Sequence, residues 1–400
     1  MDETPTPSRA WEVFRAFLGQ GLTAFGGPVA HIGYFRREFV ERRGWLGEAA
    51  FADLLALAQF LPGPASSQLG MAIGLRRAGY AGLLAAWVGF TLPAAAAMTA
   101  LAYLVPELAP GWGDGVLHGL KLAAAAVVAQ ALVAMARTLA VGPIRAGMAI
   151  GAGLGLLAEH GAVPQILALV AGGAFGLAFL REPAPTAPDD PATTQAIPVA
   201  VSAAALAVFI LLLGLLPFLA AWLDAPSLSL ASVFYRAGAL VFGGGHVVLP
   251  VLQQEIVHRG WLDQTTFLAG YGAAQALPGP LFSFAAFIGA TQVVAPAGWP
   301  GGLVALVSIF LPSLLLVVGV LPFWDRLKGR PGARGALAGV NAVVVGILAA
   351  ALWNPVLTTS IERPSDWLLA IAAYLFLAVA QMPPWLVVLA FAGLVGVFSR

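Results

Sequence analysis

The 400-residue sequence contains no cysteine, only two lysines and few charged residues of either sign. Without cysteine the chain has no disulfide, no iron–sulfur cluster and no cysteine-ligated zinc. Charged residues make up 10% of the chain, whereas soluble domains contain about 25%, so a soluble globular domain is excluded. The formal net charge is only +1. This value argues against a nucleic-acid partner, because nucleic-acid binding requires a clustered basic surface.

Hydrophobic residues make up 60% of the sequence, and apolar runs of about eighteen residues or more recur along it. Such a run is long enough to cross the roughly 30 Å hydrocarbon core as a helix. We therefore predict an all-α polytopic membrane protein that is surrounded by the lipid bilayer. The first ten residues are mostly polar and show no cleavable signal pattern, and the richness in Ala, Gly and Arg is typical of a bacterial source. We expect an uncleaved, multi-pass protein of a bacterial inner (plasma) membrane.

One six-residue stretch occurs twice, as Gln-Phe-Leu-Pro-Gly-Pro at residues 59–64 and as Gln-Ala-Leu-Pro-Gly-Pro at residues 275–280. Both copies follow an Arg-Gly-Trp-Leu sequence, and a glycine-rich break lies further upstream in each. Blocks repeated in the same order are an internal duplication. We predict a first repeat at residues 1–180, a linker with a connecting transmembrane helix at residues 181–228, and a second repeat at residues 229–400.

The Pro-Gly-Pro sequence interrupts an otherwise helical pattern in each repeat. Leu61 precedes a proline and is pushed out of the α region, and neither proline has an amide hydrogen, so a helix cannot run through the motif. The flanking apolar pieces, 49–61 and 66–75, are each too short to span the bilayer. We predict that they form a re-entrant hairpin, with a second hairpin at residues 267–277 and 282–294. Spans are expected at residues 80–105, 116–140, 144–158, 163–180, 198–223, 301–323, 333–352, 367–381 and 385–398.

The distribution of charge predicts that the two repeats are inverted relative to each other. Short cytoplasmic loops carry the excess of Lys and Arg; the first repeat has four arginines at residues 36–43, where the second keeps only Arg259. After the hairpins the bias reverses, because the first repeat has Glu107 and Asp114 where the second has four basic residues at 326–334. Inverted repeats with broken helices are the architecture of secondary transporters, whose substrate binds near the midplane where the breaks meet.

The breaks offer sites for a small anion. A helix that begins after Pro64 or Pro280 presents unpaired amide hydrogens and the positive end of its dipole, and the glycine breaks expose further amides. A tetrahedral oxyanion fits such a cradle better than a cation or a large organic molecule. The alternative is that these residues only kink membrane helices, but the duplication favours function. The candidate substrate-binding residues are Gly26, Gly27, Pro28, His31, Gln59, Pro62, Gly63, Pro64, Ser66, Ser67, Lys121, Gly243, Gly244, Gly245, His246, Gln275, Pro278, Gly279, Pro280 and Ser283.

Few ionisable side chains lie within the apolar segments. Lys121, near His118, is a candidate cationic ligand, because an unpaired ammonium inside a span costs at least about 2.5 kcal/mol. The alternative is that this lysine snorkels to the interface. Glu38 and Glu255 occupy corresponding positions in the two repeats. They are candidates for proton coupling, with an ion pair to a neighbouring arginine as the favoured alternative.

No catalytic constellation is recognisable in the sequence. Ser66 and Ser67 lack the Gly-x-Ser-x-Gly setting of a hydrolase, no His-Glu-x-x-His sequence occurs, and neither lysine lies in a phosphate-binding glycine-rich loop. An intramembrane hydrolase is therefore disfavoured, and a membrane scaffold would not require duplicated breaks. We expect a transporter rather than an enzyme, with no cofactor and no metal. The oligomeric state is left open, with a homodimer as one alternative.

Taken together, these motifs resemble the long-chain, two-domain type of the chromate ion transporter family. The resemblance rests on Phe-Gly-Gly-Pro at residues 25–28, Phe-Gly-Gly-Gly-His at residues 242–246 and the duplicated Arg-Gly-Trp-Leu and Leu-Pro-Gly-Pro sequences, and it covers residues 11–398. It implies export of chromate from the cytoplasm, chromate resistance, sulfate as a close analogue, and the proton motive force rather than ATP as the energy source. One departure is Pro28, after which the histidine of the first repeat is delayed to position 31. A transporter of sulfate or another small oxyanion is the alternative.

Overall fold

The computed structural model describes residues 7–107, 112–159, 162–180 and 197–398, and this part of the chain is helical without any β-strand. Five of the described helical segments are long and apolar enough to cross a membrane, at residues 65–104, 113–139, 199–222, 298–323 and 331–360. The predicted all-α, multi-pass architecture is therefore confirmed. The predicted flexible linker lies, apart from residue 197, outside the described residues.

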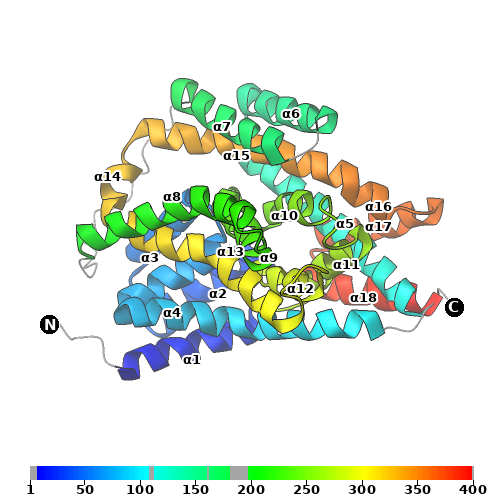
Figure 1. Cartoon of the computed structure of the whole chain (residues 1–400), viewed down its shortest axis with the longest axis horizontal. Coiled ribbons are helices and arrows are strands. Elements are labelled where there is room, and N and C mark those ends of the chain that lie inside the picture. Colours follow the sequence, from blue (N-terminus) through cyan, green and yellow to red (C-terminus); the bar gives the residue numbers. More distant parts are fainter. Residues whose placement is uncertain (1–6, 108–111, 160–161, 181–196, 399–400) are drawn as a thin grey trace.

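The helices follow the duplicated plan (Figure 1). The first repeat contains α1 (Pro7–Thr23), α2 (Gly27–Phe35), the π-helix η1 (Arg36–Arg42), α3 (Glu48–Phe60), α4 (Ala65–Leu104), the 3-10 turn η2 (Val105–Glu107), α5 (Trp112–Leu139), α6 (Pro143–Ala158) and α7 (Ala162–Phe179). The connecting helix is α8 (Val199–Trp222). The second repeat contains α9 (Pro226–Leu240), η3 (Gly245–Val247), α10 (Val248–Ile256), α11 (Gln264–Gln275), η4 (Leu281–Ser283), α12 (Phe284–Thr291), α13 (Gly298–Val320), η5 (Leu321–Phe323), α14 (Trp324–Lys328), α15 (Pro331–Ala351), η6 (Leu352–Leu357), α16 (Thr358–Ser360), α17 (Pro364–Ala378) and α18 (Pro384–Phe398).

Both glycine breaks are present where the sequence predicts them. Between α1 and α2 the φ angles of Gly26 and Gly27 are 98° and 73°, and after α9 those of Gly243 and Gly244 are 77° and 134°. These values lie in the left-handed region, which residues with a Cβ atom rarely adopt. The glycines therefore end one helix and allow the next to start in a new direction.

Two helical hairpins are present at the predicted positions, formed by α3 with the first part of α4 and by α11 with α12. The helical hydrogen bonding of α4 continues past residue 75, but Ala78 and Gly79 are non-helical and the chain folds back there. A Cβ atom on Gly74 would lie only 2.3 Å from the carbonyl oxygen of Gly82. The hairpin arm and the following span therefore pack closely against each other. The second repeat has the same arrangement, with a Cβ on Gly289 lying 2.3 Å from the carbonyl oxygen of Gly301.

The two repeats exchange their last helices. Helix α5 of the first repeat packs against α17 and α18 of the second, and α15 of the second repeat packs against α6 and α7 of the first (Figure 1). Glycines allow this close packing: a Cβ on Gly119 would lie 2.4 Å from the carbonyl oxygen of Phe391, and a Cβ on Gly339 would lie 2.1 Å from that of Gly172. Neither repeat therefore packs as a separate unit.

The connecting helix α8 lies at the periphery. Only 6% of its most apolar stretch is buried inside the protein. Large apolar side chains such as Ile210 and Phe218 are exposed. An exposed apolar surface of this kind is suited to contact with lipid tails.

Candidate anion site

A cavity of about 1200 Å³ lies where the two breaks and the two hairpin tips meet, between α5 and α15. The break and tip residues line it in pairs related by the duplication. From the breaks, Gly26, Gly27 and Pro28 correspond to Gly243, Gly244 and Gly245; from the tips, Ala58, Gln59, Leu61, Gly63 and Ala65 correspond to Ala274, Gln275, Leu277, Gly279 and Leu281. The two repeats therefore contribute equivalent surfaces to one cavity.

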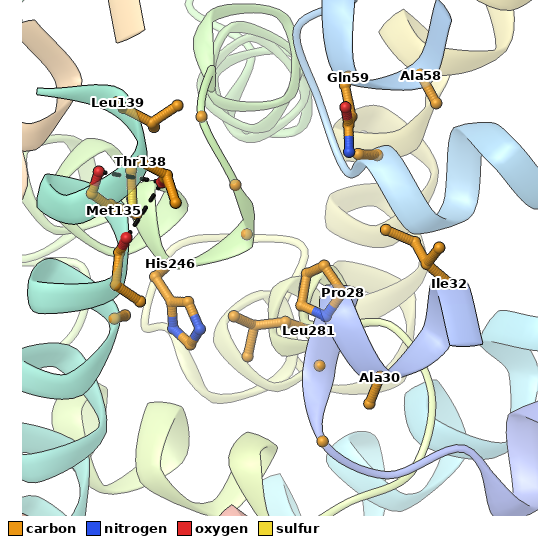
Figure 2. A pocket seen from close by; sticks show the side chains of 18 of the residues that line it. Pro28, Ala30, Ile32, Ala58, Gln59, Met135, Thr138, Leu139, His246 and Leu281 are labelled. Atoms are coloured by element: carbon orange, nitrogen blue, oxygen red, sulfur yellow. Dashed lines mark hydrogen bonds between the residues drawn. The ribbon is translucent and has the colours of Figure 1, made fainter. Parts of the chain in front are cut away.

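The breaks of the two repeats lie close to each other. A Cβ atom on Gly245 would lie 3.6 Å from Cγ of Pro28 and 3.5 Å from a methyl carbon of Leu281. Figure 2 shows Pro28 and His246 on either side of Leu281, facing the same space. The predicted meeting of the breaks is thus present in the structure.

Backbone amides at both breaks are available to a ligand. None of the hydrogen bonds within the described part of the chain uses the amides of Gly26, Gly27, Gly243, Gly244 or Gly245. All five residues line the cavity. Gly26 is exposed, Gly27, Gly243 and Gly244 are partly buried, and Gly245 is buried. Their unpaired amides can therefore bind water or a ligand in the cavity. Consecutive free amides that curve around one point are suited to binding an anion.

The amides of the tip glycines, in contrast, are already engaged. Gly63 donates to the carbonyl oxygen of Val241 at 2.6 Å, and Gly279 donates to that of Ala24 at 3.0 Å. Each acceptor lies just before the glycine break of the other repeat. The tips therefore hold the breaks in position, and the breaks rather than the tip glycines offer free donors.

Charge in the cavity has one sign. Arg145, Lys328 and Arg334 line it, and no Asp or Glu is present among its described lining residues. These three cations lie at the start of α6, the end of α14 and the start of α15, and the part of the cavity that they line is referred to here as its mouth. Lys328 also pairs with Asp53 at 3.0 Å. An electropositive, carboxylate-free cavity favours anions over cations.

One imidazole faces the cavity. Nδ1 of His246 lies 2.7 Å from the hydroxyl of Tyr271, which is fully buried. The side chain of Gln275 lies one turn further along α11, and its Nε2 has no hydrogen-bond partner within the described structure. In the tautomer in which His246 accepts at Nδ1, the hydroxyl of Tyr271 donates to it. Nε2 of His246 then carries the ring hydrogen, which makes it a neutral donor toward the cavity.

The histidine of the first repeat does not reach the cavity. His31 is buried, with its Nε2 lying 3.1 Å from the carbonyl oxygen of Ala24 and its Nδ1 lying 3.3 Å from Oγ of Ser66. The ring therefore fastens the break to the start of α4. The departure at position 28 in the sequence thus corresponds to a difference in structure between the two repeats.

Comparisons with known proteins identify the family of the chain. A family model described as "Chromate transporter" matches residues 11–177 and 228–397. The chain belongs to the chromate transporter family. It is 32% identical over 381 residues to a chromate transport protein of Pseudomonas aeruginosa, covering 91% of this chain and 85% of that protein. It is 27% identical over 405 residues to a chromate transport protein of Cupriavidus metallidurans, covering 96% and 91%. No solved structure matches the chain.

Several predicted site residues of the transporter lie behind the cavity wall rather than on it. The prolines of the tips and the serines that follow them do not line the cavity; these are Pro62, Pro64, Ser66, Ser67, Pro278, Pro280 and Ser283. The serines are buried, and Oγ of Ser67 and of Ser283 has no hydrogen-bond partner within the described structure. These residues shape the tips and the starts of the following helices, and they do not contribute to the cavity surface.

Lys121 is also absent from the cavity surface. Its side chain is buried, and Nζ lies 2.6 Å from Oε1 of Glu362 at the opposite end of α5 from the mouth. The hydrogen bond from Lys121 holds the pKa of Glu362 below its usual range. The lysine is therefore paired within the protein in this conformation. It neither lines the cavity as a ligand nor extends to the membrane interface.

The duplicated carboxylates of the transporter form ion pairs outside the cavity. Glu38 accepts from Arg43 at 2.5 Å and from Arg42 at 2.9 Å. Glu255 lies 2.8 Å from Arg236 and 2.8 Å from Arg259. Both carboxylates are largely buried, so these are sheltered pairs rather than the solvated ones that the sequence favours.

Sequence reasoning missed the cavity-lining residues of α5, α6, α14 and α15. Lys328 and Arg334 entered the sequence analysis only as part of the basic segment 326–334, and Arg145 at the start of α6 was not among the candidate site residues. Tyr271 carried no motif. Its position one turn before the duplicated Gln275 was the only indication in the sequence. The lining residues outside the predicted set also include Gln130, Met135, Thr138, Trp324 and Asn341.

Proposed function

We propose that this chain is a secondary transporter that exports chromate from the cytoplasm across a bacterial inner membrane and so confers chromate resistance. The observation that carries the proposal is the cavity, which combines free backbone amides from both breaks with three basic side chains and, among its described lining residues, no carboxylate. Two relatives over most of the chain are named chromate transport proteins. Family and site chemistry therefore indicate the same class of substrate.

The proposed ligands of the oxyanion are neutral donors at the breaks. Gly26 and Gly27 line the cavity from the first repeat, Gly243 and Gly244 line it from the second, and their amides make no hydrogen bond within the described structure; His246 lines the same cavity. A tetrahedral dianion has acceptor oxygens in several directions, so it can use donors from both repeats at once. The basic side chains at the mouth raise the local concentration of anions and guide them inward.

The direction of transport follows from the predicted topology. If the arginine-rich segment 36–43 is cytoplasmic, the mouth with its three cations opens toward the cytoplasm, in accord with the excess of basic residues on that side. Moving a dianion out of a negative-inside cell is favoured by roughly 2 × 2.3 kcal/mol per 100 mV. Export therefore needs no nucleotide. If a proton is exchanged for the anion, Glu38 and Glu255 are the candidates to carry it.

Chromate uptake into everted membrane vesicles that contain this protein tests the proposal. We expect saturable accumulation that responds to an imposed membrane potential or pH gradient and is inhibited by excess sulfate. Vesicles from cells lacking the protein provide the baseline. No movement of chromate under any gradient would overturn the proposal. Movement of labelled sulfate without chromate would retain the oxyanion transporter and change its substrate, because the cavity recognises shape and charge that the two anions share.

A further inference from the structure

A second group of basic side chains lies on the transporter, away from the cavity. Lys121 and His118 are one turn apart on α5 and face the carboxylates of Glu362 and Asp366. Besides the 2.6 Å contact between Lys121 and Glu362, Nδ1 of His118 lies 3.5 Å from Glu362 and Nε2 lies 3.2 Å from Asp366. The hydroxyl of Ser360 donates to the carbonyl oxygen of Lys121 at 3.2 Å. The cluster therefore fastens α5 to the segment between α16 and α17.

The cluster lies beyond the end of the cavity that is opposite the mouth, and this end is referred to here as the closed end because no described residue of α5 before Val127 lines the cavity. Helix α5 lines the cavity from Val127 to Leu139, so Lys121 lies about 9 Å before the nearest lining residue at 1.5 Å per residue. Helix α17 contributes to the cavity only at its far end, at Leu377 and Ala378, whereas Asp366 lies in its first turn. The carboxylate side chain of Glu362 is 53% exposed. Lys121 and His118 thus lie just beneath the surface of the closed end.

The duplication shows which residues of the second repeat correspond to Lys121 and His118. Gly119 and Gly339 make the same contact, each against the last helix pair of the other repeat. Counting from these glycines, Lys121 corresponds to Asn341 and His118 to Ala338. Both residues of α15 line the cavity. On α5 it is the later half that lines the cavity, and on α15 the earlier half, as expected when two equivalent helices run in opposite directions.

In a transporter with inverted repeats, the open and closed ends exchange when the repeats exchange conformations. We infer that Lys121 and His118 form a second anion site, which lines the cavity when it opens toward the other face and is occupied by the carboxylates of Glu362 and Asp366 in the conformation described. This inference rests on the proposed transport function. A carboxylate oxygen and a chromate oxygen accept the same hydrogen bonds from an ammonium group. The anion therefore replaces Glu362 as the partner of Lys121. The lysine is paired with Glu362 in one conformation and with the anion in the other.

The first test separates an anion ligand from a structural ion pair. Lys121→Met alone leaves Glu362 beside an uncharged group and changes stability as well as transport. The double variant Lys121→Met/Glu362→Gln removes both charges and keeps the packing. If Lys121 is a ligand, this double variant is made in normal amounts and loses transport by at least about tenfold, the effect of removing one charge-assisted hydrogen bond. Wild-type transport by the double variant would overturn the inference and leave oxyanion transport intact.

The second test measures exposure directly, because the chain contains no cysteine. Leu117→Cys reports on the closed end, and Leu337→Cys, at the corresponding position of the cavity wall, is its matched control. We expect an impermeant maleimide to label Leu337→Cys from the mouth side and Leu117→Cys from the opposite side only. Glu362→Gln should speed labelling at position 117 several-fold, and sulfate should slow it. Labelling of both positions from the same side would contradict the exchange, whether or not chromate is the substrate.

Discussion

Gly63 of the first hairpin tip donates its amide hydrogen to the carbonyl oxygen of Val241 at 2.6 Å, just before the glycine break of the second repeat. The reciprocal bond joins Gly279 to Ala24. Each tip is thus fastened to the break of the other repeat. Because the free amides of the cavity follow directly after these acceptors, the two hydrogen bonds set the position of the proposed anion ligands.

Substitution of Gly63 tests this coupling. Its φ angle is 118°, and a Cβ atom would lie 2.5 Å from Oγ of Ser313 and 2.8 Å from Nε2 of Gln68. We expect Gly63→Ala to destabilise the protein by about 1–2 kcal/mol from backbone strain alone, with a further loss from the contacts. At Gly279 the nearest atoms are 3.2 Å away, so Gly279→Ala should be the milder change. Thermal unfolding in detergent measures both, and equal stability of Gly63→Ala and wild type would contradict the proposed packing.

Gly244 tests the cavity wall itself. A Cβ atom there meets nothing within 4 Å, although φ is 134°. Gly244→Ala should therefore strain the backbone without a clash and place a methyl group beside the free amides. We expect the KM for chromate to rise by about tenfold or more, equivalent to roughly 1.4 kcal/mol of binding. Gly44→Ala is the matched control, because Gly44 also has positive φ and open space but lies outside the cavity. If both variants raised the KM for chromate equally, backbone strain alone would explain the effect of Gly244→Ala.

Tyr271 is expected to act through His246. Tyr271→Phe removes the hydrogen bond to Nδ1, and a net hydrogen bond contributes about 0.5–1.5 kcal/mol. The KM for chromate should therefore rise by up to about tenfold. In His246→Gln, whose amide supplies a donor without help from the tyrosine, adding Tyr271→Phe should change little. A double-mutant cycle measured by vesicle uptake decides the question. Additive losses would show that the tyrosine hydroxyl matters for packing and not for the ring.

The ion pair at the mouth predicts a dependence on charge. Asp53 accepts from Lys328 at 3.0 Å and from Nε1 of Trp324 at 3.1 Å. Lys328→Gln leaves the carboxylate less compensated near the path of the anion. We expect a several-fold slower uptake at low ionic strength that is largely lost at high ionic strength, because exposed charges are screened by salt. The double variant Lys328→Gln/Asp53→Asn should recover most of the rate. If the slower uptake did not depend on salt, it would result from a structural change and not from long-range electrostatic attraction of the anion.

The sequence predicted the elements that depend on local chemistry. Proline and glycine interrupt a continuous helix, so these residues predicted the positions of the breaks at Gly26 and Gly243 and of the hairpin tips. Their duplication indicated that they meet. Contacts between distant helices were not predictable in this way. The pairing of Lys121 with Glu362, and the arrival of Arg145 and Arg334 at one mouth, depend on the exchange of the last helices between repeats, for which no local pattern exists.

The topology prediction also gains a structural constraint. The contact between Asp53 and Lys328 joins the first hairpin to α14, and Glu48, at the start of the same hairpin arm, pairs with Arg36. The arginine-rich segment of the first repeat and the basic segment of the second therefore lie on one face of the molecule.

Single cysteines at exposed positions can locate that face. We expect Arg37→Cys and Arg326→Cys to be labelled only from the cytoplasmic side, because both lie in segments rich in basic residues. His258→Cys, in the segment of the second repeat that corresponds to the first arginine-rich segment, should be labelled only from the opposite side. An impermeant maleimide applied to intact cells and to everted vesicles separates the two. If positions 37 and 258 were labelled from the same side, the repeats would not be inverted. The argument that the mouth faces the cytoplasm, and with it the direction of export, would then have no support from charge.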